Sequence, residues 1–334
     1  MSALVLGLGM ACPLGLRLRS ALAAVEAGIS PFVDRDDMLA PGGPPRVAML
    51  DEARVPPTRS ERAAFFARHA VREVLGEQIP ATRPLATILA LPAPGIGPRI
   101  DPRALLHALP GAPLVLHAAV EEGRAGTFAA LDLAHELLTR GREPLVLVLA
   151  ADSLVDAETL RSLGDHDRLL GRTNRDGILP GEGAACLLLG LQADPSRRPL
   201  ARIHALALAR EVEPFARAGT KVGGALALTD VFRSLLHEVD ARVDEVFVGA
   251  TGQVYFAREF SHAYLRNVAR MPEPLRTRLL ADALGDVGAA AGAMAAAHAV
   301  MRLSPTRWAP ANRMNLVYAA SDEGLVGGCV MVPP

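Results

Sequence analysis

Lysine is nearly missing from this chain of 334 residues, and Lys221 is its only one. Arginine therefore carries almost all of the positive charge, a bias that indicates a GC-rich coding sequence more than a function. Cysteine is also scarce. Cys12, Cys186 and Cys329 are too few for a disulfide framework, and they stand in apolar, strand-like or turn segments. Such usage is typical of a reducing compartment, so we expect a cytoplasmic location.

Long apolar runs are absent too, and none approaches the roughly 20 residues that a helix needs to cross a membrane. The alanine-rich stretch from Ala289 to Ala299 is short and interrupted by Gly292. The apolar N-terminus has no basic region before it, which is typical of a strand and turn rather than of a signal peptide. With 35 basic and 36 acidic residues in no segregated pattern, we expect neither nucleic acid nor an anionic membrane as a partner.

What is present is an alternation of short β-rich runs with helical stretches rich in alanine and leucine, which predicts an α/β protein with buried strands. Strands are expected at residues 4–8, 85–90, 114–117, 145–150, 184–189, 201–206, 245–249, 314–319 and 328–332. Helices are expected at residues 17–27, 60–75, 126–138, 228–239, 255–268 and 287–303. A polar connector at residues 192–199 and an irregular surface excursion at residues 33–59 interrupt the pattern.

The most specific segment runs from Arg172 to Leu191 and reads RTNRDGILPGEGAACLLLGL. Asp176-Gly177 predicts a turn, the run from Pro180 to Gly183 predicts a second one, and an apolar strand follows. This order resembles the RDGFxxGEGAGxLxLE segment of β-ketoacyl synthases, including the glutamate between two glycines.

Two further stretches resemble the same family. Residues 4–30 resemble its opening VxGxGxxxPxG, and residues 285–301, GDVGAAAGAMAAAHAVM, resemble GHxxGAAG and the helix that follows it. Gly7-Leu8-Gly9 offers an alternative start of a dinucleotide-binding loop, but the third glycine and a suitable acidic residue are missing. We therefore expect no cofactor and no metal.

The resemblance implies a thiolase fold, a five-layered αβαβα sandwich made of two similar halves. The halves would span residues 1–198 and 199–334. Proteins of this fold usually form two-fold dimers through an edge strand of the first half, which we expect at residues 144–150, so a homodimer is expected.

The resemblance also locates the catalytic positions. The family's nucleophilic cysteine stands at a helix N-terminus, where the helix dipole favours a thiolate. The matching position here is Gly123, after Glu121 and Glu122, and glycine has no side chain to acylate. Thr127 is the nearest hydroxyl.

The remaining catalytic positions are changed as well. The family's first histidine corresponds to Gly249 and the second to Asp286, an acid in place of a base. The family's lysine would fall near Ala281. Four changes at four separated motifs predict that condensing activity is absent.

If the fold is correct, polar residues from several segments should meet in the former active-site cleft. They are Glu121, Glu122, Thr127, Thr251, Gln253, Asp286, Ser321, Asp322 and Glu323. They would either form a repurposed binding site or serve as solvated loop and helix-cap residues, and ordinary turn and cap chemistry favours the second interpretation.

Three functions remain open at this point. The changed motifs and the short chain resemble ketosynthase-like proteins encoded beside type VI secretion genes, which predicts a non-catalytic adaptor or chaperone for a secretion effector or spike component. A second hypothesis is a chain-length-factor-like partner of an active β-ketoacyl synthase subunit. The third is a diverged acyltransferase or thioesterase that uses Thr127 or the carboxylates.

Overall fold

The computed structural model describes residues 2–38, 43–50, 55–76, 84–109, 113–192, 197–218, 223–305 and 311–334. Ten strands form one hydrogen-bonded sheet in the order β10-β9-β11-β12-β8-β1-β7-β6-β4-β5. The sheet divides naturally between β8 and β1, because β1 (Ala3–Ala11) pairs with β7 along its length but with β8 only at Ala3 to Val5.

The first half of the chain supplies the strands in the order β5-β4-β6-β7-β1. They are β4 (Leu85–Leu91), β5 (Leu114–Glu121), β6 (Leu145–Ser153) and β7 (Glu182–Gly190), in addition to β1. β4, β5 and β6 are parallel, while β7 runs antiparallel to both of its neighbours. Every residue of β4 and β7 is buried, which is why these strands are continuous apolar runs in the sequence.

The second half repeats this arrangement. Its strands are β8 (Ala201–Arg210), β9 (Glu245–Val248), β10 (Thr277–Leu279), β11 (Asn315–Ala320) and β12 (Leu325–Val332), in the order β10-β9-β11-β12-β8. As in the first half, the fifth strand in chain order is the antiparallel one, since β12 opposes both β11 and β8.

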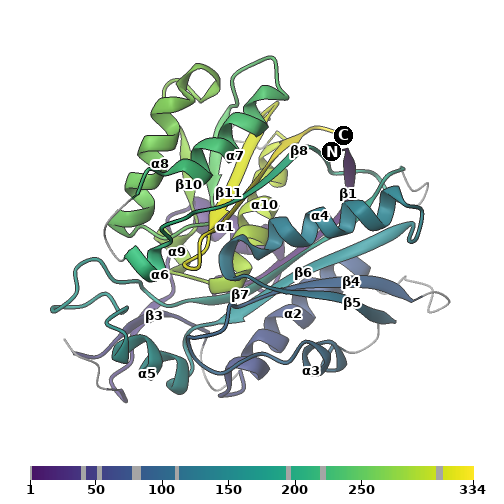
Figure 1. Cartoon of the computed structure of the whole chain (residues 1–334). Helices are drawn as coiled ribbons and strands as arrows, with labels where there is room; N and C mark the ends of the chain where they lie inside the picture. Colours follow the sequence, from purple (N-terminus) through teal and green to yellow (C-terminus); the bar gives the residue numbers. More distant parts are fainter. Residues whose placement is uncertain are drawn as a thin grey trace.

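Helices lie outside each part of the sheet and between the two parts (Figure 1). α2 (Arg59–Leu75) and α3 (Pro102–His107) cover the outer face of the first half, and α7 (Leu226–His237) and α8 (Val254–Arg266) lie in the outer layer of the second. α4 (Gly126–Thr139) and α10 (Ala291–Arg302) contact strands of both halves. The result is the five-layered αβαβα sandwich of the thiolase fold, as the sequence predicted.

The composition of α10 explains how it fits between the two halves. Every residue from Ala291 to Val300 is buried, and all of them except Met294, His298 and Val300 are alanine or glycine. At Gly292 a Cβ atom would stand 2.7 Å from the carbonyl oxygen of Arg124. Small side chains therefore allow the helix to approach both α4 and the strands on either side.

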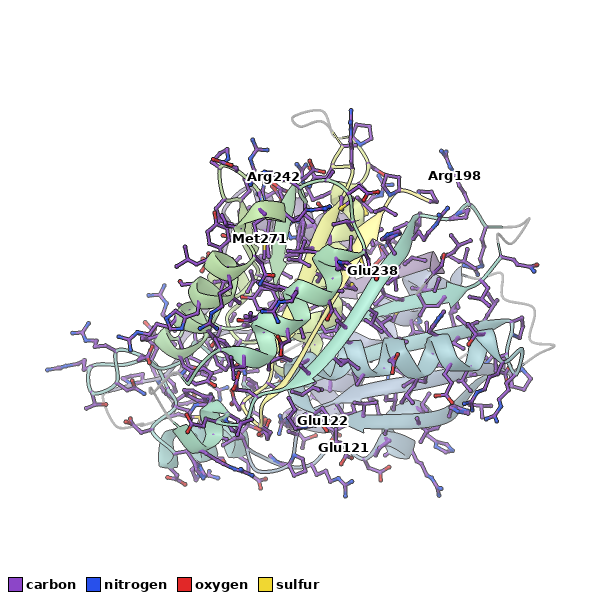
Figure 2. All side chains as sticks on the ribbon, turned by 45° about the horizontal axis from the view of Figure 1, so that its top comes forward. Glu121, Glu122, Arg198, Glu238, Arg242 and Met271 are labelled. Carbon is purple, nitrogen blue, oxygen red and sulfur yellow. The ribbon has the colours of Figure 1, made fainter. Side chains whose placement is uncertain are left out.

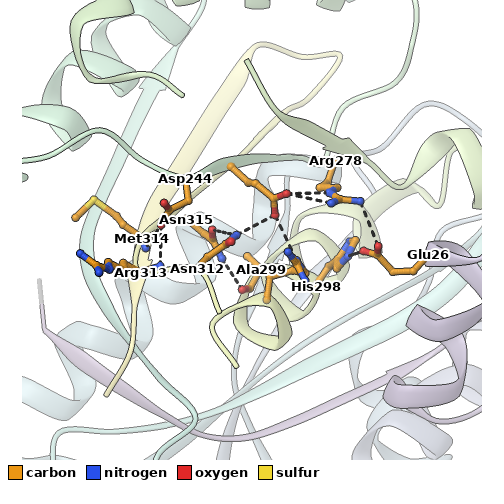
Figure 3. Close-up of polar contacts among 11 residues, drawn as sticks. Glu26, Asp244, Arg278, His298, Ala299, Asn312, Arg313, Met314 and Asn315 are labelled. Carbon is orange, nitrogen blue, oxygen red and sulfur yellow. Dashed lines mark hydrogen bonds and ion pairs between the residues drawn. The ribbon is translucent and has the colours of Figure 1, made fainter. Parts of the chain in front are cut away.

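A polar network also joins the halves (Figure 3). Glu26, at the end of α1 (Leu18–Glu26), pairs with His298 of α10 at 2.7 Å and with Arg278 of β10 at 3.2 Å. Arg278 also pairs with Glu245 of β9 at 3.0 Å. Asn312 donates to the second oxygen of Glu245, at 2.9 Å.

The excursion predicted as irregular contains a small hairpin, β2 (Phe32–Asp34) and β3 (Arg46–Ala48). The backbone of Ala48 donates to the carbonyl of Pro180 at 2.8 Å, so the hairpin is attached to the first half. The remaining short elements are the helices α5 (Ala157–Asp165), α6 (Phe215–Ala218) and α9 (Ala281–Leu284), and the 3-10 turns η3 (Gly123–Ala125), η4 (Val268–Arg270) and η5 (Gly288–Ala290).

All nine predicted strands and all six predicted helices overlap elements of the structure. The predicted dimer edge at residues 144–150 is wrong, because β6 lies between β7 and β4 and the edge strand of this half is β5. Apolar runs show that strands are buried, but they do not encode the order of strands in a sheet. Within the described ranges, no helix is long and apolar enough to cross a membrane.

Candidate functional site

A small cavity of ≈ 70 Å³ lies where the first half meets the second, in front of Gly123. Its walls come from the turn after β4, the start of η3, the ends of β6 and α5, the loop before β7, the segment before η5 and the β11–β12 turn. One water needs roughly 10–15 Å³ by the same measure, so the cavity has room for several waters. It is therefore much smaller than an ordinary ligand pocket.

Gly123 begins η3, the turn that leads directly into the central helix α4. Its φ of +65° lies in the left-handed region, which glycine adopts without strain. A Cβ atom there would have Ser321 Oγ as its nearest neighbour, at 3.5 Å, so space for a side chain exists. The structure thus places Gly123 at the start of a long helix, facing the cavity, with no reactive group.

Arg124, the next residue, occupies the cleft instead. Its side chain is 7% exposed, and its guanidinium faces Asp286 with two nitrogens, one of them Nε at 3.0 Å from Oδ1. Nη1 donates to Asp322 at 2.7 Å. Burial by itself would lower the pKa of Arg124, but the two carboxylates more than offset it and hold this pKa above the usual range.

Asp322 completes the arrangement with a second arginine, since its other oxygen accepts from Nη2 of Arg168 at 2.9 Å. Burial opposes ionisation of Asp322, yet Arg124 and Arg168 outweigh that effect and lower the pKa of this carboxyl. Each guanidinium also lies over an aromatic ring, Arg124 over Phe256 and Arg168 over Phe215. We call Arg124, Arg168, Asp286 and Asp322 the cleft lattice.

The two positions that correspond to the family's histidines differ in their surroundings. Asp286 lies in the cleft lattice and also accepts from the backbone of Gly288 at 3.0 Å. At Gly249 a Cβ atom would stand 3.0 Å from the Cβ of Ala319 and 3.2 Å from Ala291. A side chain at position 249 would therefore fit only if these neighbours moved by a few tenths of an ångström. Ala281, near the predicted lysine position, begins α9 and lines a neighbouring cavity with Asp286.

Glu121 and Glu122 lie side by side at the rim of the molecule and do not line the cavity (Figure 2). Glu121 pairs with Arg99 at 2.8 Å, and Glu122 pairs with Arg210 at 2.7 Å. Their side chains are thus engaged with surface arginines.

Thr127 is fully buried within α4 and faces Gly292 of α10 instead of the cavity. No hydrogen-bond partner is found for its Oγ1 among the described residues. Within the described ranges, therefore, no base is hydrogen-bonded to this hydroxyl to activate it.

Thr251 and Gln253 form a junction between the halves. The Thr251 hydroxyl donates to Gln253 Oε1 at 3.1 Å, and Gln253 Nε2 donates to the carbonyl of Asp176 at 2.8 Å. The carboxylate of Asp176 accepts from the backbone of Val254 at 2.7 Å. These residues hold the predicted Asp176-Gly177 turn against the start of α8.

The β11–β12 turn has two kinds of contact with the cleft. Ser321 accepts from the backbone of Ala125 at 2.9 Å and donates to the carbonyl of Glu122, so it fixes the start of α4. Asp322 enters the cleft lattice, while Glu323 lines the cavity mouth. Of the nine predicted cleft residues, the structure brings Asp286, Asp322 and Glu323 to the cavity itself.

The sequence reasoning missed the arginines. Arg124 and Arg168 stand in turns, where no sequence pattern indicates a role for arginine. Arg59 stands in the first turn of α2, where arginine is equally uninformative. Arg59 pairs with Asp152 at 2.9 Å on another wall of the cavity. No local signal separates a buried arginine from an exposed one.

The motif glutamate has a structural role. Glu182 is fully buried and receives two bonds from Arg62, at 2.6 and 2.7 Å, and one from the Ser153 hydroxyl at 3.0 Å. The motif is specific because a buried charge needs this complete set of partners.

The described lining of the cavity is poor in groups for covalent chemistry, although the carboxylates of Asp152, Asp286, Asp322 and Glu323 line it. Its described lining contains no cysteine, serine, threonine, histidine or lysine. All three cysteines are buried elsewhere, and burial raises the pKa of Cys12 to about 12. Among the described residues, no group of histidine, cysteine, aspartate and glutamate is arranged to hold a metal ion.

The sequence matches no family model and no curated protein. Solved structures do match. A type II polyketide synthase ketosynthase, in complex with its acyl-carrier protein, is 15% identical with a TM-score of 0.78, and the match covers 99% of both chains. A β-ketoacyl synthase from Burkholderia phymatum STM815 is 15% identical with a TM-score of 0.75, again over 99% of both. The ishigamide ketosynthase/chain length factor is 20% identical with a TM-score of 0.70 over 100% of both. These neighbours share the thiolase fold with this chain.

Proposed function

We propose that this chain is a non-catalytic ketosynthase-fold subunit that works through protein contacts, as a chain-length-factor-like partner of an active β-ketoacyl synthase. The observation that supports it most is the cleft lattice, which lines the cavity in front of Gly123 with paired charges. A described cavity lining without cysteine, serine or threonine, with Gly249 closely surrounded by Ala319 and Ala291, does not suit acyl transfer.

The surface that would receive the partner is formed by β5, α4 and β8. β5 is the edge strand of the first half, and α4 contacts both β5 and β8 (Figure 1). Apolar side chains are exposed on each element: Val115 is 51% exposed, Leu133 is 36% and Leu208 is 37%. Half-buried Ala118, Val120, Ala129 and Leu206 lie between them on the central core. An open strand edge flanked by apolar residues favours association with another chain.

The neighbour that combines a ketosynthase with a chain length factor supports a ketosynthase as this partner. The same surface could receive a second copy of the chain, which is the expected homodimer. The secretion adaptor stays a prediction from the sequence, because no contact or cavity of the described residues favours an effector or spike component.

The test is co-expression with the ketosynthase encoded nearest to this gene, followed by size-exclusion chromatography with light scattering. We expect a one-to-one complex, with mass spectrometry identifying a partner that has an intact cysteine and two histidines. Val115→Asp should separate the two chains. Leu265→Asp, at an α8 position that is 67% exposed, is the matched control and should leave the complex intact.

Two results would contradict the proposal. A chain that stays monomeric with every available ketosynthase has no such partner. Turnover of acyl-thioesters by the purified chain, abolished by Thr127→Ala or Glu121→Gln, would establish the diverged acyltransferase or thioesterase instead.

A further inference from the structure

The carboxylate of Asp322 is held in a way that resembles a bound ligand. Each of its two oxygens accepts from a different arginine, Arg124 Nη1 at 2.7 Å and Arg168 Nη2 at 2.9 Å. Both arginines belong to the first half, whereas Asp322 comes from the β11–β12 turn of the second. Two guanidinium groups directed at one carboxylate are the usual protein recognition of a small anion.

Both arginines are positioned by contacts that do not involve Asp322. Arg124 is fixed by Asp286 and lies over the ring of Phe256, with its Cζ 5.5 Å from the ring centroid. Arg168 lies over the ring of Phe215 at 4.6 Å. The two guanidinium groups would therefore keep their places if the Asp322 side chain were removed.

Arg168 also has hydrogen-bonding capacity to spare. Its Nε is buried and has no acceptor among the described residues, although the side chain lines the cavity. A buried donor without an acceptor is costly, which favours an additional acceptor at this wall.

From these contacts we propose that Arg124 and Arg168 form a binding site for a small carboxylate, and that Asp322 occupies this site as an internal ligand. The site goes beyond the proposed partner function, since it requires no second protein. A free carboxylate of the size of formate or acetate would take the place of the Asp322 side chain and restore the charge balance of the two arginines.

The experiment is chemical rescue of Asp322→Ala, with the full chain and formate, acetate or phosphate as probes. We expect the variant to unfold at a lower temperature than the wild type. Sodium formate at 100 mM should raise its midpoint by about 2 °C or more over sodium chloride of equal ionic strength, because a ligand that binds only the folded state stabilises it. Wild-type protein, in which Asp322 fills the site, should show no such difference.

Three controls decide the outcome. Asp230→Ala removes a carboxylate from an exposed pair with Arg233 and should show no rescue. Asp322→Ala combined with Arg168→Met should lose the rescue. Asp322→Ser serves in the same way if the alanine variant does not fold. Equal effects of formate and chloride, or a rescue that persists without Arg168, would overturn the proposal; stronger stabilisation by phosphate than by formate would contradict the carboxylate assignment.

Discussion

The two central helices begin alike but differ in what surrounds their first residue. Each is preceded by a 3-10 turn that starts with a glycine of positive φ, Gly123 at +65° before α4 and Gly288 at +54° before α10. At Gly288 a Cβ atom would stand 2.1 Å from Oδ2 of Asp152, whereas at Gly123 the nearest atom is 3.5 Å away. One position admits only glycine, and the other has room for a side chain.

The difference extends to the charges at each helix start. Asp152 is held by Arg59 and accepts from the backbone of Ala289 at 3.0 Å, so both charges belong to the same half. At the start of α4, Arg124 pairs across the boundary with Asp286 and Asp322 of the second half. The start of α10 is thus a packed structural junction, while the start of α4 has room for a side chain at Gly123 and is bordered by charges from both halves.

The largest loss of stability is expected from Arg124→Met, because this change leaves the carboxylates of Asp286 and Asp322 without their main partner. Removing one member of a buried ion pair typically costs about 3–5 kcal/mol. The free energy of unfolding from denaturant titration measures the loss. Arg233→Met, at an exposed pair on α7, should change it by no more than about 0.5 kcal/mol. Equal effects of the two variants would show that the cleft lattice adds nothing to stability.

Gly288→Ala should have the second largest effect and lower the free energy of unfolding by about 3 kcal/mol. The new methyl group would meet Asp152, and alanine is strained at this positive φ. Gly28→Ala is the matched control, since Gly28 also has a positive φ, +72°, but no atom within 4 Å of its Cβ position. It should cost about 1 kcal/mol. Similar losses of unfolding free energy in both variants would show that the contact with Asp152 does not distinguish Gly288 from other glycines of positive φ.

Gly123→Cys should fold with a loss of only about 1 kcal/mol, since the strain of a positive φ is its main cost. The new thiol should be alkylated by iodoacetamide faster than the three buried native cysteines, as mass spectrometry can measure. Condensation of acyl and malonyl thioesters should stay absent, because Gly249 and Asp286 supply no histidine. Condensing activity in this variant would show that the cleft lattice does not block the site.

Acid should weaken the cleft lattice through Asp322. The pKa of this carboxyl is lowered in the folded state, so its stabilising effect is complete above the unfolded value near 4 and is lost as the pH falls through the lowered pKa. One such group changes stability by at most about 1.4 kcal/mol per pH unit. Denaturant titrations between pH 6 and 2.5 should therefore show a steeper acid loss for the wild type than for Asp322→Asn, and parallel curves would contradict this role.

Much of the fold could be predicted from the sequence because its signals are local. Buried strands such as Leu85–Leu91 and the alanine-rich α10 read as continuous apolar segments, and the motif around Glu182 marks a buried glutamate with its turns. The glycines at positions 123 and 249, which the resemblance aligns with catalytic residues, were equally visible, since a missing side chain is a property of the sequence. Short elements with little burial pattern, such as β10 and α9, were missed.

The contents of the cleft could not be predicted in the same way. Glu121, Glu122 and Thr127 stand within a few residues of Gly123, yet two of them face surface arginines and the third packs against Gly292. Arg168 and Asp322, far apart in the chain, meet at 2.9 Å. Whether a side chain points into a cleft depends on backbone direction and on partners from other segments.

The sequence by itself determined the alternation of elements and the absence of a cysteine at position 123 and of histidines at positions 249 and 286, because apolar periodicity and residue identity act locally. Only the tertiary structure decided that β5 is an edge of the sheet, that position 249 is closely surrounded, and that the cavity is lined by arginine–carboxylate pairs. These outcomes depend on strand order and on long-range charge pairing, since a buried charge is tolerated only where the fold brings its partner to it.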